Sequence, residues 1–108
     1  MSKEYWDKRY EDGRGSGNGS RKNRGYARLA FIGSYFDPKE DTIIDYGCGD
    51  LALWGGGMGQ SHKAKLPSFF VGVDYSKVIL LKNEKAFPLH TWLTPEEYLH
   101  YFKIHERA

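Results

Sequence analysis

The chain has 108 residues, which is room for one domain and excludes a large enzyme of several lobes. Its 40% hydrophobic and 28% charged residues are typical of a folded protein and exclude disorder of the whole chain. The 16 basic and 14 acidic side chains give a formal charge of +2, which offers no general case for nucleic-acid binding.

Cysteine content and hydropathy indicate the compartment. Cys48 is the single cysteine, so an internal disulfide is excluded and a reducing environment fits best. The first ten residues, "MSKEYWDKRY", have no apolar core, and no run approaches the roughly 20 apolar residues that span a bilayer. We expect a cytoplasmic protein that is neither secreted nor embedded in a membrane.

The N-terminal third contains two predicted helices and a loop. "SKEYWDKRYED" begins with a capping serine and spaces its aromatic residues as a short amphipathic helix does. Gly13 to Gly25 has five glycines and four basic residues and predicts a loop or tether. Tyr26 to Phe36 places apolar residues on one helical face, and the following Asp37-Pro38 disfavours further helix.

The middle of the chain predicts two strands and their helices. "TIIDYG", from Thr42 to Gly47, and "SFFVGVD", from Ser68 to Asp74, are rich in β-branched or aromatic residues, and both run into an aspartate. A helix capped by Ser76 is expected to follow the second strand. We also expect a helix between the two strands, which makes the strands parallel.

A third strand and a last helix complete the predicted elements. A short strand is expected near Leu89 to Trp92. In "TPEE", Thr94 is a helix cap and Glu97 completes a capping box, which predicts a helix from Pro95 to about His105.

These elements predict an α/β, Rossmann-like three-layer sandwich, truncated to about three parallel strands with flanking helices. Residues 1–36 are expected to form N-terminal helices and a basic glycine-rich loop, and residues 37–108 a partial ligand-binding domain. Ligands of such sheets bind beyond the carboxyl ends of the strands.

Two aspartates and two glycines are therefore expected to meet at one edge of the sheet. Asp45 and Asp74 end neighbouring strands, and Gly47 and Gly49 would let the backbone approach a ligand closely. The N-terminus of the next helix would favour a carboxylate or phosphate. Asp74 is placed to accept hydrogen bonds from the two hydroxyls of a ribose.

Two cofactor classes compete for this loop. Gly47, Gly49 and Ala52 fit the dinucleotide pattern G-x-G-x-x-A, which favours a nicotinamide cofactor such as NAD. Asp45 distinguishes the two classes, since "IIDYGCGD" resembles motif I of the class I S-adenosylmethionine-dependent methyltransferases. "FFVGVDYS" likewise resembles that family's second strand. "YWDKRYEDGRGSGNGS" is similar to an N-terminal signature of a bacterial and phage branch, so the resemblance runs from Tyr5 to about Phe87.

The resemblance implies an N-terminal portion of a methyltransferase, with S-adenosylmethionine or S-adenosylhomocysteine as ligand. By it, Asp45, Gly47 and Gly49 contact the methionine part, Asp74 holds the ribose and the loop from Ser16 to Ser20 folds over the site. The cofactor-binding residues that it implies are Asp45, Tyr46, Gly47, Gly49, Asp74 and Tyr75, the last beside the adenine. No catalytic residue and no methyl acceptor can be assigned.

The chain also departs from the family. Leu51 stands where a third glycine is common, and 25 residues separate Gly49 from Asp74 instead of the roughly 20 typical of such units. "GGGMGQSHK" has the look of an insertion that shortens the first helix or forms a flap. A complete domain would continue with further strands, so the alternative function is a non-catalytic relic or subunit that self-associates or needs a partner.

Other residues have simpler interpretations. Cys48 is expected to be a buried hydrophobe and not a nucleophile. The four histidines form no metal pattern, and we expect no metal. The basic loop from Arg14 to Arg28 leaves a nucleic-acid contact open, although a solvated loop is the ordinary explanation. Trp54 and Trp92 are expected to be packing residues.

Overall fold

The computed structural model describes residues 2–12 and 36–106, with side chains described as far as residue 101. The first helix, α1 (Lys3–Glu11), is confirmed, and the hydroxyl of its cap Ser2 accepts a hydrogen bond from the Tyr5 N–H at 3.2 Å. The predicted loop from Gly13 to Gly25 lies outside the described residues, as does the predicted helix over Tyr26 to Phe36 except for its last residue.

The centre of the molecule is a three-stranded parallel sheet, as predicted. The strands are β1 (Thr42–Tyr46), β2 (Phe69–Val73) and β3 (Thr91–Leu93), in the order β1-β2-β3. Asp45 is aligned with Gly72, so both predicted strands end at one edge of the sheet. The third strand starts two residues later than Leu89, which is 97% exposed in the preceding turn.

Both helices after the second strand are confirmed. The helix α3 (Lys77–Ala86) is capped by Ser76, whose hydroxyl accepts from the Ile79 N–H at 3.4 Å. The helix α4 (Pro95–Glu106) begins with the predicted capping box. Thr94 N–H donates to the Glu97 carboxylate at 3.0 Å, and the Glu97 N–H donates to the Thr94 hydroxyl at 3.2 Å.

The prediction of an α-helix between β1 and β2 is wrong. That segment contains only two single turns of 3-10 helix, η2 (Ala52–Trp54) and η3 (Ser61–Lys63). The reason is backbone conformation, because a right-handed helix needs negative φ and several residues here have positive φ. These residues are Leu51, Gly55, Gly57, Met58 and Gly59. The glycine-rich segment therefore forms turns in place of the expected helix.

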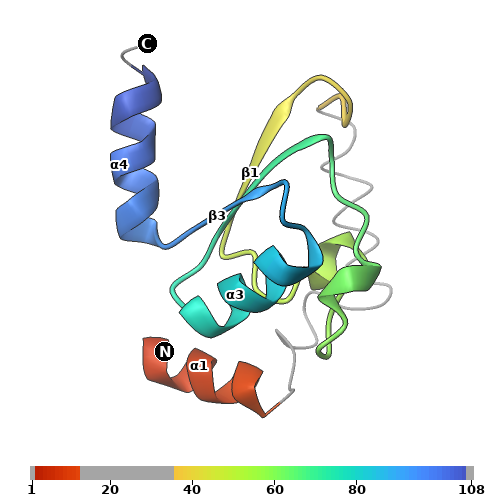
Figure 1. Ribbon diagram of the computed structural model, residues 1–108, viewed down its shortest axis with the longest axis vertical. Helices are drawn as coiled ribbons and strands as arrows, with labels where there is room; N and C mark the ends of the chain where they lie inside the picture. Colours follow the sequence, from red (N-terminus) through yellow and green to blue (C-terminus); the bar gives the residue numbers. More distant parts are fainter. Residues whose placement is uncertain (1, 13–35, 107–108) are drawn as a thin grey trace.

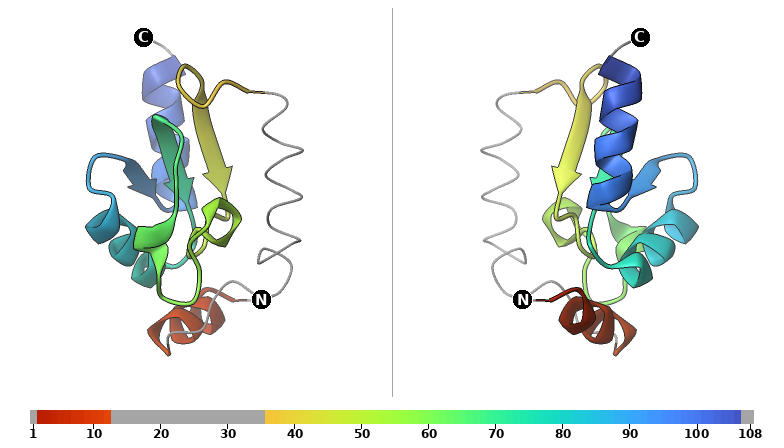
Figure 2. Two further views of the ribbon diagram at one scale, coloured as in Figure 1. Left: turned by 90° about the vertical axis from the view of Figure 1, so that its right-hand side faces the viewer. Right: turned by 90° about the vertical axis from the view of Figure 1, so that its left-hand side faces the viewer.

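Helices cover the two faces of the sheet, which gives three layers (Figure 2). On one face, Phe70 and Trp92 pack with Leu80 of α3 in the main apolar cluster. Side chains alternate along a strand, so Tyr46 points to the other face, where its ring meets Tyr98 of α4 at 6.0 Å between centroids. The predicted α/β sandwich with three parallel strands is thus confirmed.

The helix α1 packs on α3 near the carboxyl ends of the strands (Figure 1). Its Asp7 carboxylate accepts a hydrogen bond from the Ser76 hydroxyl, and its Tyr10 carbonyl accepts one from the Lys82 ammonium at 2.6 Å. In Figure 2 the yellow arrow of β1 points toward the end of the molecule where α1 lies. This helix therefore borders the edge where ligands of parallel sheets bind. The predicted boundary at residue 36 stays a prediction.

Candidate functional site

The loop after β1 turns back over the end of β2. The N–H groups of Gly47 and Cys48 both donate to the Val73 carbonyl, at 2.7 and 3.0 Å. Gly47 and Gly49 have φ of 85° and 52°, which side chains with a Cβ rarely adopt. Both glycines thus make the tight turn that their sequence indicates, and Gly47 lies exposed at its outer side.

Asp74 connects this loop to the loop after β2. One carboxylate oxygen accepts from the Gly49 N–H at 2.9 Å, and the other from the Ser76 N–H at 3.0 Å. Burial raises the pKa of Asp74, and the charge of Asp7 raises it further, whereas the backbone hydrogen bonds act in the opposite direction. Asp74 is thus both an anchor of the loop and a half-buried acceptor at the site.

Asp45 has an internal partner that the sequence did not indicate. Its carboxylate accepts a hydrogen bond from the indole N–H of Trp54 at 2.9 Å. Burial raises the pKa of Asp45 and the neighbouring charge of Asp74 adds to it, while the indole hydrogen bond lowers it. Trp54 packs against Phe70 with 5.4 Å between ring centroids, so it is a packing residue as predicted and also a partner of the site.

The two predicted tyrosines lie beside each other at this edge. Tyr46 and Tyr75 are 57% and 61% exposed, and their phenol groups interact. The structure therefore brings together all six predicted residues around the carboxyl ends of β1 and β2. Large exposed rings of this kind are available to contact the base of a ligand.

Cys48, which is part of the loop, and Asn83 of α3 lie on the buried side of the turn. Cys48 is buried, and burial followed by the charges of Asp74 and Asp45 raises the pKa of its thiol well above the ordinary value, which fits a packing residue and not a nucleophile. Asn83 of α3 is fully buried, and its amide N–H donates to the Gly49 carbonyl at 2.8 Å. Sequence reasoning missed Asn83, although it occupies the buried face of α3 together with Ile79 and Leu80.

The Asn83 amide is only half satisfied. Its carbonyl oxygen has no hydrogen-bond partner within the described ranges. One buried hydrogen bond contributes about 1 kcal/mol, whereas a buried acceptor without a partner costs about 1–3 kcal/mol. The two contributions are therefore of similar size and opposite sign.

The segment "LALWGGGMG" is organised around a buried aspartate. The Asp50 side chain accepts from the Met58 N–H at 2.9 Å, and its carbonyl accepts from the Gly57 N–H at 3.0 Å. Asp50 is 1% exposed and Leu51 is fully buried with φ of 64°. Leu51 thus takes a left-handed conformation, which glycine adopts more readily, and its side chain fills the core.

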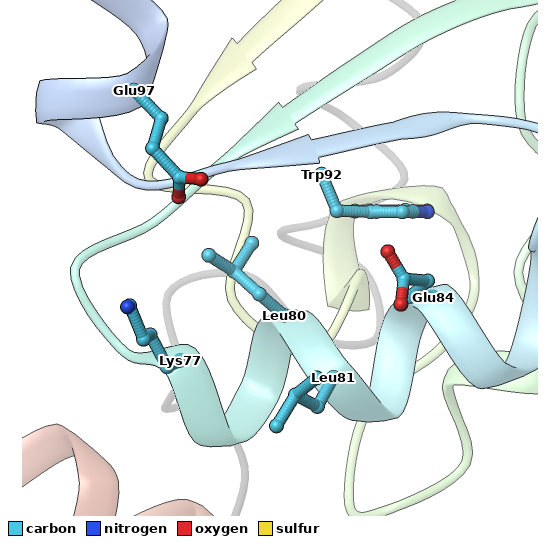
Figure 3. Close-up of a pocket in the computed structure, with 6 residues that line it drawn as sticks. All are labelled: Lys77, Leu80, Leu81, Glu84, Trp92 and Glu97. Atoms are coloured by element: carbon cyan, nitrogen blue, oxygen red, sulfur yellow. The ribbon is translucent and has the colours of Figure 1, made fainter.

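A small pocket lies between α3, β3 and the first turn of α4 (Figure 3). Its volume is about 220 Å³, and its lining comes from α3, β3 and the first turn of α4. The lining residues are Lys77, Leu80, Leu81, Glu84, Trp92 and Glu97. It does not include the predicted cofactor residues, and it is smaller than the roughly 300–1,000 Å³ typical of ligand pockets.

Residues 2–12 and 36–106 contain neither a metal-ligand cluster nor a membrane-spanning helix. No group of three histidine, cysteine or acidic side chains there is arranged to hold a metal ion. No helix in that part of the chain is long and apolar enough to cross a membrane. The basic loop from Arg14 to Arg28, at which a nucleic-acid contact is left open, lies outside the described residues.

Comparison of the chain with protein-family models, with curated proteins and with solved structures gives no match. The resemblance to the methyltransferases therefore depends on the motifs themselves and on the geometry in which they meet.

Proposed function

We propose that the chain binds S-adenosylmethionine and is the cofactor-binding part of a methyltransferase. The observation that carries this proposal is the junction of Asp45, the Gly47–Gly49 turn and Asp74 at the carboxyl ends of two adjacent parallel strands. This is the edge at which open α/β sheets bind their ligands.

The residues present fit an adenosyl cofactor. A Cβ added at Gly47 would meet nothing within 4 Å, so the backbone there is accessible to a ligand. Asp74 would hold the ribose with the lone pairs that its hydrogen bonds from the backbone of Gly49, Tyr75 and Ser76 leave free. Tyr75 would lie beside the adenine, and Asp45 near the methionine part. When bound, the cofactor supplies a methyl group on a positively charged sulfonium.

Charge and local structure favour this cofactor over NAD. After burial, which is the largest cause for both groups, the Asp7 carboxylate raises the pKa of Asp74 and the Asp74 carboxylate raises the pKa of Asp45, so this edge carries three neighbouring acidic groups. Such an acidic edge suits a sulfonium and an ammonium and repels a diphosphate. Moreover, a dinucleotide diphosphate binds at the N-terminus of the helix after the glycines, and here the glycines lead into the single turn η2.

Isothermal titration calorimetry with S-adenosylhomocysteine tests the proposal. We expect binding by the parent chain, and Asp74→Ala should weaken it by about tenfold or more, because a charge-assisted hydrogen bond contributes about 1.5–3 kcal/mol. Glu40→Ala, an exposed carboxylate before β1, is the matched control and should change nothing. No heat from the parent at millimolar ligand, or tighter binding of NAD, would refute the proposal.

Self-association is the second candidate, favoured by the edge of the sheet. Within the described residues β1 pairs with β2 alone, and it exposes 42% of Ile44 and 57% of Tyr46. An apolar edge strand without lysine or proline readily pairs with another chain. Light scattering after size exclusion is expected to give a mass above that of one chain if this edge is used, and a monomer at high concentration would exclude self-association.

A further inference from the structure

Gly49 is held from both sides by side chains outside its own loop. Its N–H donates to Asp74 at the end of β2, and its carbonyl accepts from the Asn83 amide of α3 at 2.8 Å. Both partners follow Gly49 in the chain by more than twenty residues. The position of the turn is therefore set by β2 and α3.

This arrangement stands where a helix would otherwise fix the turn. In a parallel sheet of this type, the residues after the glycines normally enter an α-helix, whose first turn holds the loop. Here Leu51 has φ of 64° and only the three-residue turn η2 follows. With no helix after the glycines, the Asn83 amide holds the loop in place through the Gly49 carbonyl.

The choice of an amide at this position calls for a reason other than stability. Asn83 is fully buried, and its amide nitrogen donates to the Gly49 carbonyl at 2.8 Å and to Cys48 Sγ at 4.0 Å, while its carbonyl oxygen has no partner among the described residues. A leucine of similar volume would bury no such acceptor, but it would release the Gly49 carbonyl.

We propose that Asn83 is a positioning residue, which fixes the Gly49 carbonyl and thereby the shape of the turn that contacts the adenosyl ligand. This inference rests on the proposed function for the identity of the ligand. Asn83 acts through Gly49 and is not itself in contact with the ligand.

The first experiment replaces Asn83 by leucine in the full chain. Binding of S-adenosylhomocysteine should weaken by about tenfold, the effect of one lost hydrogen bond on a positioned group. In a [15N]glycine-labelled sample, the amide signals of Gly47 and Gly49 should shift, while that of Gly59, in the segment around Asp50, should not. Glu84→Leu, the exposed neighbour on the same helix, is the matched control for both readouts.

The second experiment uses Asn83→Asp, which has the same shape and a titratable group. Burial favours its neutral form, which can donate to the Gly49 carbonyl, whereas the ionised form cannot. Affinity relative to the parent at the same pH should therefore fall as the pH rises. Cys48, Asp45 and Asp74 are the titratable groups of the adjoining loop and strand ends. Because the parent contains them too, their contribution to the pH dependence of affinity cancels in the comparison.

The outcomes are separable from those of the proposed function. If the parent binds no S-adenosylhomocysteine, the proposed function fails, and the glycine signals alone then decide the role of Asn83. Unchanged Gly47 and Gly49 signals in Asn83→Leu would overturn the positioning role. Loss of the folded state in both variants, at acid and at neutral pH, would also overturn it in favour of a structural role.

Discussion

The loops after β1 and β2 are held in place by different kinds of contact. Each follows the carboxyl end of a parallel strand, and an aspartate of the candidate site lies at that strand end, Asp45 within β1 and Asp74 directly after β2. The second loop reaches a helix within three residues, and Asp74 and Ser76 hold it by hydrogen bonds to N–H groups two or three residues later. The first loop runs from Gly47 to Ser68 with no α-helix, and it is anchored on Asp74 and Asn83.

The difference separates local from distant determinants of a site. The second loop is stabilised by a capping serine and an aspartate, whose partners are fixed by sequence spacing. The first loop has positive φ at Gly47, Gly49 and Leu51, and the hydrogen bonds that anchor its Gly49 form only when β2 and α3 have packed. Substitutions in the first loop should therefore cost more than comparable ones in the second.

The largest effect is expected at Leu51. Leu51→Ala should lower the free energy of unfolding by about 3 kcal/mol, because the side chain is fully buried in the core. Leu51→Gly should be no worse, since glycine adopts the φ of 64° without the strain of about 1–2 kcal/mol that a Cβ causes. Urea denaturation measures both, and a clearly less stable glycine variant would contradict the strain at Leu51.

Gly56 provides the next largest effect. A Cβ there would lie 2.7 Å from the Asp50 carbonyl oxygen, a backbone atom that cannot rotate away. Gly56→Ala should cost about 2 kcal/mol by overpacking. Gly59→Ala is the control in the same segment, because its Cβ would meet nothing within 4 Å and only the φ of 77° opposes it. Thermal unfolding that ranks the two variants the other way would disprove the close packing around Asp50.

A smaller effect is expected in the second loop. Ser76→Ala removes the cap of α3 and should cost about 1 kcal/mol, as capping residues generally do. It also removes the hydroxyl that donates to Asp7 of α1. Ser76→Thr keeps the hydroxyl and should retain most of the stability in the same denaturation experiment. A cost above that of Gly56→Ala would reverse the comparison of the two loops.

The smallest expected effect is the pH dependence of the unfolding free energy that Asp45, at the end of β1, causes. Burial raises the pKa of Asp45 above its ordinary value of 3.8, so its contribution to stability is complete below that value and is lost as the pH rises through the folded-state pKa. The unfolding free energy of the parent should thus fall relative to that of Asp45→Asn as the pH rises. Asparagine keeps an acceptor for the Trp54 indole N–H.

Asp7 is the control for the sign of this pH effect. Burial raises its pKa, but the hydrogen bonds from Lys3 and Ser76 outweigh burial, so the net shift is downward. Its contribution is therefore present above pH 3.8 and is lost as the pH falls. Urea titrations of Asp45→Asn and Asp7→Asn over the acid range should diverge from the parent with opposite slopes, and equal slopes would refute the assignment.

Sequence patterns predicted the elements whose signals are local. The capping serines and the Thr94 to Glu97 box located α1, α3 and α4 to within about two residues. β-Branched and aromatic residues located the strands, and the aspartates at their ends located the candidate site. The helix between β1 and β2 was wrongly predicted, because the expectation of a βαβ unit outweighed the glycines that exclude it.

The sequence by itself determined which residues stand at the carboxyl ends of the parallel strands, since spacing along one strand decides where that strand ends. Only the tertiary structure decided their partners: Trp54 for Asp45, and Asn83 with Asp74 for Gly49. It also decided that Leu51 could take a left-handed conformation, because burial in the core offsets the strain. Contacts between residues far apart in the chain leave no periodic pattern, whereas caps and strands do.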